Sequence, residues 1–210
     1  MSSADDFSRI LPSYLTDSTR KAIKAALKSF WESNRVLNDP FSYNNNDFFL
    51  QGDILKNVPF PTWIGESFFT VPTANCIILS NTCDMDVENT RVSPINCVLA
   101  PIFSIEKYQQ KLRDNHQSEK KINDFYENLI SYQLSHLFYL PIDEEFNYSR
   151  EGKGYFVALD RAFSLPRYVL DLNQHVKSLN QFGSYLFTFQ ISVNLCRFHD
   201  KVDRDAGICF

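Results

Sequence analysis

Five short apolar runs are the feature that most constrains how this chain can fold. Each is rich in β-branched or aromatic residues and is bounded by Gly, Pro, Asn or Asp, a combination typical of short strands between turns. Helical patterns do not alternate with these runs, so they favour a small, strongly bent antiparallel barrel over a doubly wound α/β sheet. The runs are residues 52–55, 76–81, 97–103, 137–142 and 155–166.

Two segments outside the runs predict helices. Residues 104–136 contain no Gly or Pro, and we expect two helices there with a break near residues 114–118. Residues 15–33 place apolar side chains at helical spacing, and Asp17 or Ser18 can cap this amphipathic helix.

The end of the chain admits two interpretations. Ser178 and Gln181 fit a capping box, and the apolar residues that follow recur at helical spacing. β-branched and aromatic residues in the same stretch favour a strand instead. We expect the helix, packed on the barrel.

The length of the chain, 210 residues, suits one hydrophobic core with helical additions. Nineteen Phe and ten Tyr residues supply much of the apolar area for that core. We therefore expect a mainly β fold of the α+β type, in which helices decorate a barrel. The expected parts are a helical extension at 1–50, a barrel at 51–172 with an insertion at 104–136, and a C-terminal helix at 173–210.

The net charge of −4 argues against a broadly basic surface that would hold nucleic acid by its phosphates. Local basic patches stay open as binding surfaces. Arg20, Lys21, Lys24 and Lys28 share one face of the expected N-terminal helix. That face is either solvated or a docking surface for an acidic partner or RNA.

The five cysteines are odd in number and form no CxxC pair. No signal-peptide pattern opens the chain, and no apolar run approaches the roughly 20 residues that span a bilayer. The sequence thus predicts a reduced, cytoplasmic protein without a membrane partner. Dinucleotide, P-loop, zinc-protease and hydrolase motifs are missing too, so we expect no cofactor and no nucleotide-dependent enzyme.

The polar segment between the second and third runs is the first candidate site, because loops of a barrel collect binding residues. It carries Cys83, Asp84, Asp86 and Arg91. Its many Asn, Asp, Ser and Thr side chains also suit a hydrogen-bonded turn, in which Asp84 caps the backbone and Arg91 faces water or pairs with an acid. We expect a structured loop first and a site second.

This segment could carry two kinds of chemistry, a reactive cysteine or a metal site. A reactive Cys83 thiolate needs a base, for which His136 or His199 is available, but the acidic neighbours of Cys83 oppose ionisation. The alternative is a partly buried Cys83 that begins a turn. The segment also contains metal-ligand types, yet their spacing preorganises no zinc site, so we expect no metal.

Arg161 is a further candidate. It precedes Phe163 by two positions in the last run, so both side chains would point to one face of a strand. Inside the core, Arg161 would need a carboxylate partner, which Asp84 or Asp86 can supply. On the outer face, Arg161 would indicate no particular role.

The order of four motifs resembles the MazF/PemK toxins and their SH3-like barrel relatives. The motifs are "GDIL", "IILSN", "VLAPI" and "GKGYFVALDRAFSLPR", within about residues 51–170. The resemblance implies an SH3-like barrel, pairing as a homodimer, and a role in a toxin–antitoxin or anti-phage system.

The sequence departs from that family at its catalytic positions. The family's endoribonuclease chemistry relies on a basic residue in the first loop and a Thr or Ser near the end of the third strand. Here only Lys56 and Ser104 stand near those places. Without a positioned cation, RNA cleavage loses its main electrostatic stabilisation.

Two functions therefore stay open. The first is a binding or regulatory module that acts with a protein partner, or with RNA or DNA. The second is an enzyme, a divergent MazF-like endoribonuclease or other nuclease, whose rebuilt site uses Cys83, Asp84, Arg91 and Arg161.

Overall fold

The computed structural model describes residues 39–43, 47–64, 67–142 and 152–195, with single positions between residues 16 and 32. For residues 62–64 and 67–72 it describes the backbone only. Most of the N-terminal helix predicted at 15–33, and the chain after residue 195 with His199, lie outside the described residues.

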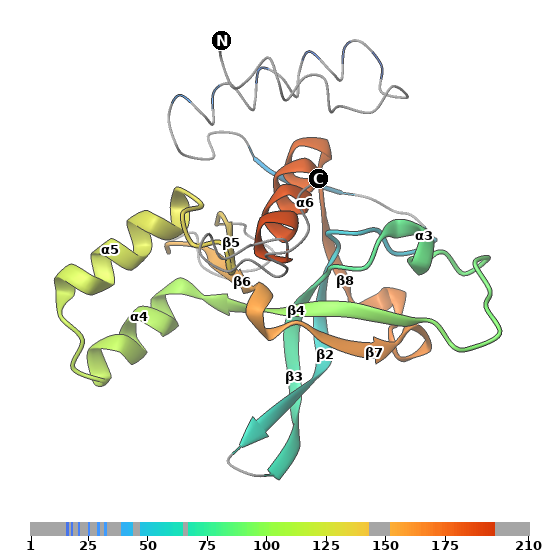
Figure 1. The fold of residues 1–210 in the computed structure, drawn as a ribbon, viewed down its shortest axis with the longest axis horizontal. Coiled ribbons are helices and arrows are strands. Elements are labelled where there is room, and N and C mark those ends of the chain that lie inside the picture. Colours follow the sequence, from blue (N-terminus) through green and yellow to red (C-terminus); the bar gives the residue numbers. More distant parts are fainter. Residues whose placement is uncertain are drawn as a thin grey trace, which may run out of the picture.

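The described strands form one antiparallel sheet that curls into a half-barrel (Figure 1). Along the sheet the order is β1-β8-β2-β3-β4-β6-β5, and β7 pairs with β4 beside this path. The fold is thus α+β with a mostly β core, as the sequence predicts. The strands are β1 Phe41–Ser42, β2 Ile54–Ile64, β3 Ser67–Ile78, β4 Asn96–Ser104, β5 Leu137–Leu140, β6 Tyr155–Ala158, β7 Phe163–Pro166 and β8 His175–Leu179.

The last apolar run makes two strands instead of one. β4 is long enough to pair with both, β7 along its first half and β6 along its second. A 3₁₀ turn, η1 Leu159–Arg161, lies between β6 and β7 and redirects the chain. Two further 3₁₀ turns, η2 Arg167–Val169 and η3 Leu172–Gln174, lead into β8.

Four α-helices occur in the described segments: α3 Thr82–Met85, α4 Ile105–Asp114, α5 Glu119–Ile130 and α6 Gln181–Leu195. The predicted break in 104–136 is confirmed, because α4 and α5 are separate helices. Ser104 caps α4 by accepting a hydrogen bond from the Lys107 N–H, and Ser118 caps α5 by accepting from the Lys121 N–H. None of the described helices is both long and apolar enough to cross a bilayer.

The predicted C-terminal helix is confirmed as α6, but the predicted cap is wrong. Asn180, not Ser178, accepts the hydrogen bond from the Gly183 N–H, at 2.9 Å. The Asn180 amide also donates to the Asp39 carbonyl at 2.6 Å and to the Phe41 carbonyl at 3.3 Å, and so ties the helix start to β1. Ser178 lies in β8, the strand directly before α6, and its hydroxyl is 3.1 Å from the His175 Nε2.

The apolar runs are continuous because the sheet buries both faces. In β3, Ile77 packs into a core with Phe138 and α6, whereas its neighbours Cys76 and Ile78 pack into a second core on the other face. A third core lies where α4 and α5 cover β5 and β6, around Phe156. β2 and β3 continue past the sheet as a two-stranded ribbon (Figure 1).

Candidate functional site

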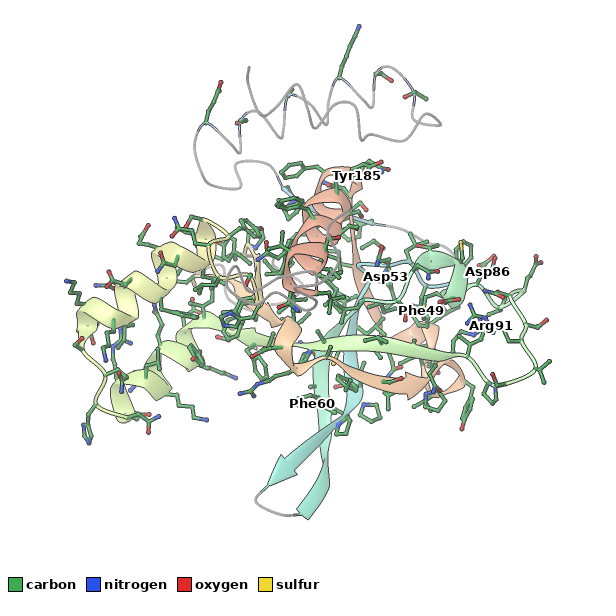
Figure 2. The ribbon with its side chains drawn as sticks, in the orientation of Figure 1. Phe49, Asp53, Phe60, Asp86, Arg91 and Tyr185 are labelled. Carbon is green, nitrogen blue, oxygen red and sulfur yellow. The ribbon has the colours of Figure 1, made fainter. Side chains whose placement is uncertain are left out.

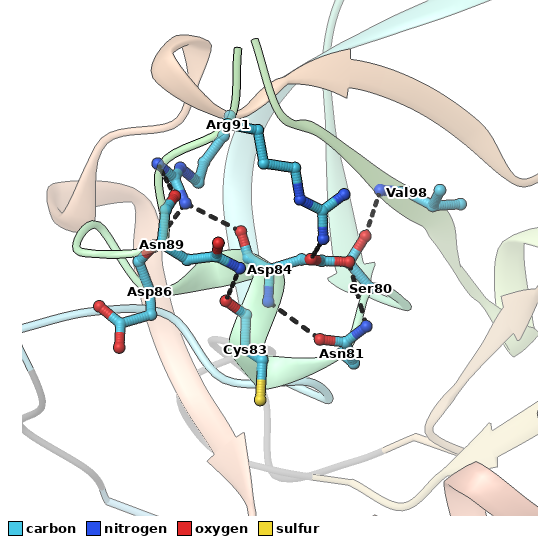
Figure 3. A network of polar contacts seen from close by, with 9 residues as sticks. Ser80, Asn81, Cys83, Asp84, Asp86, Asn89, Arg91 and Val98 are labelled. Carbon is cyan, nitrogen blue, oxygen red and sulfur yellow. Dashed lines mark hydrogen bonds and ion pairs between the residues drawn. The ribbon is translucent and has the colours of Figure 1, made fainter. Parts of the chain in front are cut away.

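The segment from Cys83 to Arg91 is a hydrogen-bonded connection between β3 and β4 (Figure 3). Asn81 caps the single turn of α3: its side-chain oxygen accepts from the Asp84 N–H at 2.9 Å, and its amide donates to the Asp84 carboxylate at 3.0 Å. The Asn89 amide closes the connection by donating to the Cys83 carbonyl at 2.7 Å. Local side-chain bonds of this kind are what the turn interpretation predicts.

Arg91 and Asp84 form an ion pair across this connection (Figure 3). Arg91 is exposed, with 55% of its side-chain surface accessible, so the pair is largely in solvent. The two Asp84 oxygens are both engaged, one by Arg91 and the other by Asn81. Asp84 therefore holds the turn together and presents no uncommitted carboxylate oxygen for general acid-base work.

Arg167 is a residue of this segment that sequence reasoning missed. Its guanidinium donates to three backbone carbonyls, those of Asp84 at 3.0 Å, Asn89 at 3.2 Å and Asp86. It reaches them because β7 pairs with β4, and the Arg167 N–H itself donates to the Ile95 carbonyl at 2.8 Å. Only that strand pairing could have pointed to it, since Arg167 follows Asp84 by more than eighty positions.

Cys83 is exposed, where the sequence predicted a partly buried residue. Its proposed base His136 lies directly before β5, which Figure 1 shows across the molecule from α3. The second proposed base, His199, is outside the described residues. The described geometry thus places neither proposed histidine beside Cys83, and a catalytic thiol there gains no support.

The other two described cysteines are buried and unreactive. Burial raises the pKa of Cys76 to about 12, and burial also raises the pKa of Cys97. Within the described segments, no group of three or more His, Cys, Asp or Glu side chains gathers where it could hold a metal ion.

Arg161 does not lie where strand alternation put it. It belongs to the 3₁₀ turn before β7, so it does not share a strand face with Phe163, and it is exposed. Its guanidinium lies over the Phe103 ring, 5.5 Å from the ring centroid, and not beside Asp84 or Asp86. Figure 2 shows Asp86 and Arg91 at the end of the molecule away from α4 and α5. The four candidate residues are therefore not one site.

Gly52 and Asp53, the pair that begins the first motif of the MazF/PemK resemblance, are buried and have a structural role. Gly52 adopts a φ of 88°, and the Asp53 carboxylate accepts from the Leu50 N–H at 2.8 Å. His175 Nε2 lies 3.7 Å from Asp53 and also meets Ser178. Because one ring nitrogen faces both partners, this group does not have the geometry of a catalytic triad.

The structure places Arg161 in a cleft of about 940 Å³. The cleft lies between the end of β4, helix α4 and the base of the β2–β3 ribbon. We call it the basic-aromatic cleft and define it by the six residues that carry the argument: Phe103, Lys107, Tyr108, Lys111, His136 and Arg161. Ser104, the hydroxyl suggested by the toxin resemblance, also lines it.

The lining of this cleft is positively charged in a protein whose net charge is −4. Among the described lining residues, Lys107, Lys111 and Arg161 contribute three cations and Asp160 contributes the one carboxylate. Lys107 and Lys111 are one helical turn apart on α4, and both are exposed. A concave surface with this excess of cations concentrates anions.

Aromatic rings form the adjoining wall. The Tyr108 centroid lies 5.0 Å from that of Phe125 and 5.2 Å from that of Phe156, and Phe103 contacts Phe156 at 5.7 Å. Tyr108 keeps 37% of its surface accessible, so one side of this packed group faces solvent. An exposed ring held in place by others can stack against a planar group.

No protein-family model matches this sequence, and no curated protein matches it. The MazF/PemK resemblance and the homodimer that it implies therefore stay predictions.

Proposed function

We propose that this protein is a binding or regulatory module that holds an anionic partner, protein or nucleic acid, in the basic-aromatic cleft. The observation that carries the proposal is the gathering of Lys107, Lys111 and Arg161 around one concavity of an acidic chain. These cations come from α4 and from η1, which the fold brings together. A module of this kind needs no activated nucleophile, and the hydrogen bonds of Asp84 are those of a turn.

A binding experiment with matched charge reversals tests this function. The probes are a labelled single-stranded oligonucleotide, a poly-glutamate peptide and inorganic triphosphate, and binding is followed by anisotropy or calorimetry at two salt concentrations. Lys107→Glu with Lys111→Glu reverses the charge of the cleft. Lys120→Glu with Lys121→Glu is the control, since these exposed lysines of α5 do not line it.

We expect the protein to bind at least one probe, with an affinity that falls at higher salt. The cleft variant should lose tenfold or more in affinity, and the control should stay within about twofold. Failure of every anionic probe to bind, or an equal loss in both variants, would overturn the proposal.

A nuclease is the second candidate, because His136 and Arg161 line the same cleft as Ser104. An imidazole can move protons and a guanidinium can stabilise the charge that develops on a phosphate. The discriminating assay is cleavage of RNA and DNA with and without divalent metal. Cleavage lost in His136→Ala and Arg161→Ala, but kept in Cys83→Ala and Arg91→Ala, would favour a nuclease sited in the cleft over the binding module.

The toxin resemblance extends the proposal to a cellular setting. A module that acts in a toxin–antitoxin or anti-phage system would be encoded beside a partner that it binds. Co-expression with the neighbouring gene products, followed by a binding assay on the purified pair, tests this extension. The SH3-like barrel and the homodimer are proposed on the same resemblance.

A further inference from the structure

We propose that the ligand of the basic-aromatic cleft is a nucleotide, with its base stacked on Tyr108 and its phosphates held by Lys107, Lys111 and Arg161. This inference rests on the proposed function, because it fills the same anion-binding cleft with a small ligand in place of a macromolecular partner. No glycine-rich phosphate loop is involved. The cations are side chains carried by a helix and a 3₁₀ turn.

The size of the cleft fits a small ligand. Its volume of about 940 Å³ lies within the range of roughly 300 to 1,000 Å³ typical of small-molecule sites. A nucleotide also combines the two properties that the lining selects, namely several negative charges and one planar ring system. An acidic peptide would satisfy the cations and leave the aromatic wall without a matching group.

The cations can hold phosphates from two directions. Lys107 and Lys111 project from successive turns of α4, and Arg161 comes from η1 after β6. The Arg161 guanidinium is already oriented, because it lies over the Phe103 ring at 5.5 Å. An ordered guanidinium loses less conformational entropy when it binds a phosphate than one that is free in solvent.

Tyr108 is the surface for the base. It precedes Lys111 by three positions on α4, so the two side chains lie on one face of the helix, and a base stacked on Tyr108 would leave its phosphates close to Lys111. Phe125 and Phe156 brace the Tyr108 ring from α5 and β6. The braced ring needs little reordering on binding, and Asn75 and His136 add polar groups to the same lining for contacts with the base or sugar.

Calorimetry on the full chain tests the inference. The probes are the four common nucleoside triphosphates, inorganic triphosphate, adenosine, and a short single-stranded oligonucleotide. At least one nucleoside triphosphate should bind about fivefold or more tightly than inorganic triphosphate, the factor expected for one base stacked on an aromatic ring. Adenosine alone should bind more weakly than ATP.

Variants locate the two halves of the ligand. Tyr108→Phe should keep the advantage of the nucleotide over inorganic triphosphate, and Tyr108→Ala should abolish it while leaving triphosphate binding unchanged. Lys111→Ala, at an exposed position that the fold does not need, should weaken nucleotide and triphosphate alike. Lys120→Ala on α5 should weaken neither.

The possible failures are distinguishable. Equal binding of inorganic triphosphate and of every nucleotide, or binding of the oligonucleotide alone, would overturn the nucleotide inference and leave the anion-binding module standing. Failure of every probe to bind would overturn both the nucleotide inference and the anion-binding module. A Tyr108→Ala protein that fails to fold does not rescue the inference, because the nucleotide-over-triphosphate comparison in the unaltered chain decides it.

Discussion

Three arginines of the described residues have different roles. Arg91 pairs with Asp84 in solvent, Arg161 lies over Phe103 at the cleft, and Arg167 donates to the carbonyls of the β3–β4 connection. The sequence pointed to Arg91 and Arg161 and not to Arg167. The role of Arg167 depends on the pairing of β7 with β4, which brings distant residues together and which no local sequence pattern encodes.

Replacing Arg167 should cost more stability than replacing Arg91. Arg167→Ala leaves three part-buried carbonyl acceptors without their donor, and we expect a loss of about 1 to 3 kcal/mol in the free energy of unfolding. Arg91→Ala removes one exposed ion pair and should cost less than about 1 kcal/mol. Urea unfolding of both variants measures the difference, and equal losses would contradict this division of roles.

A buried thiol and two partly buried phenols predict a loss of stability at alkaline pH. Burial raises the pKa of Cys76 from 9.0 to about 12 and that of Tyr139 from 10.0 to about 12, and it raises the pKa of Tyr132 well above its usual value. Between pH 9 and 12 the folded protein therefore binds more protons than the unfolded chain, so the free energy of unfolding falls as pH rises.

Urea unfolding between pH 8 and 11 measures this dependence. The free energy of unfolding should be nearly level below pH 9 and decline above it. Cys76→Ala removes the earliest of these groups, so its decline should be shallower between pH 9 and 10, whatever its stability at pH 8. A profile that rises above pH 9 would contradict the assignment.

Whole elements were more predictable from sequence than their exact connections. The strands were recognised because a sheet buried on both faces produces continuous apolar runs, as Cys76, Ile77 and Ile78 show. The break between α4 and α5 was recognised from polar residues that favour caps, such as Ser118. The composition of the last run predicts one strand, because it does not reveal the 3₁₀ turn η1 that divides the run into two partners of β4.

The contact between α6 and the chain before β1 predicts an unusual effect of a glycine substitution. Gly→Ala inside a helix normally stabilises by up to about 1 kcal/mol. At Gly183 the added Cβ would lie 2.5 Å from the backbone oxygen of Pro40, which cannot move away as a side chain would. We expect this clash to dominate, so that Gly183→Ala lowers the free energy of unfolding by about 1 kcal/mol or more.

Ser192→Ala provides the control for that substitution. Ser192 is exposed on the same helix, where its hydroxyl donates to the Thr188 carbonyl at 2.9 Å. This variant should be neutral or slightly stabilising, because Ala has the higher helix propensity. A Gly183→Ala protein as stable as Ser192→Ala would show that α6 does not pack against Pro40 as described.

In the molecule as a whole, the polar connection between β3 and β4 and the basic-aromatic cleft are separate places. The connection after β3 is a hydrogen-bonded turn to which Arg167 also donates, and the basic-aromatic cleft lies across the sheet at α4. The sequence did not predict this cleft, because its described lining comes from β2, β3, β4, α4, α5, β5, β6, η1 and the chain just before β5, and only the curled sheet brings them together. Lys107 and Lys111 were visible in the sequence, but on a helix they resemble any solvated face.

Backbone amide chemical shifts, recorded while inorganic triphosphate or ATP is added to the full chain, decide between the two places. We expect the shifts that change in proportion to ligand to lie in residues 104–111, at His136 and in residues 157–161, around the cleft. Residues 82–91 should stay unchanged. Changes confined to residues 82–91, or no changes at millimolar ligand, would contradict the placement of the functional site.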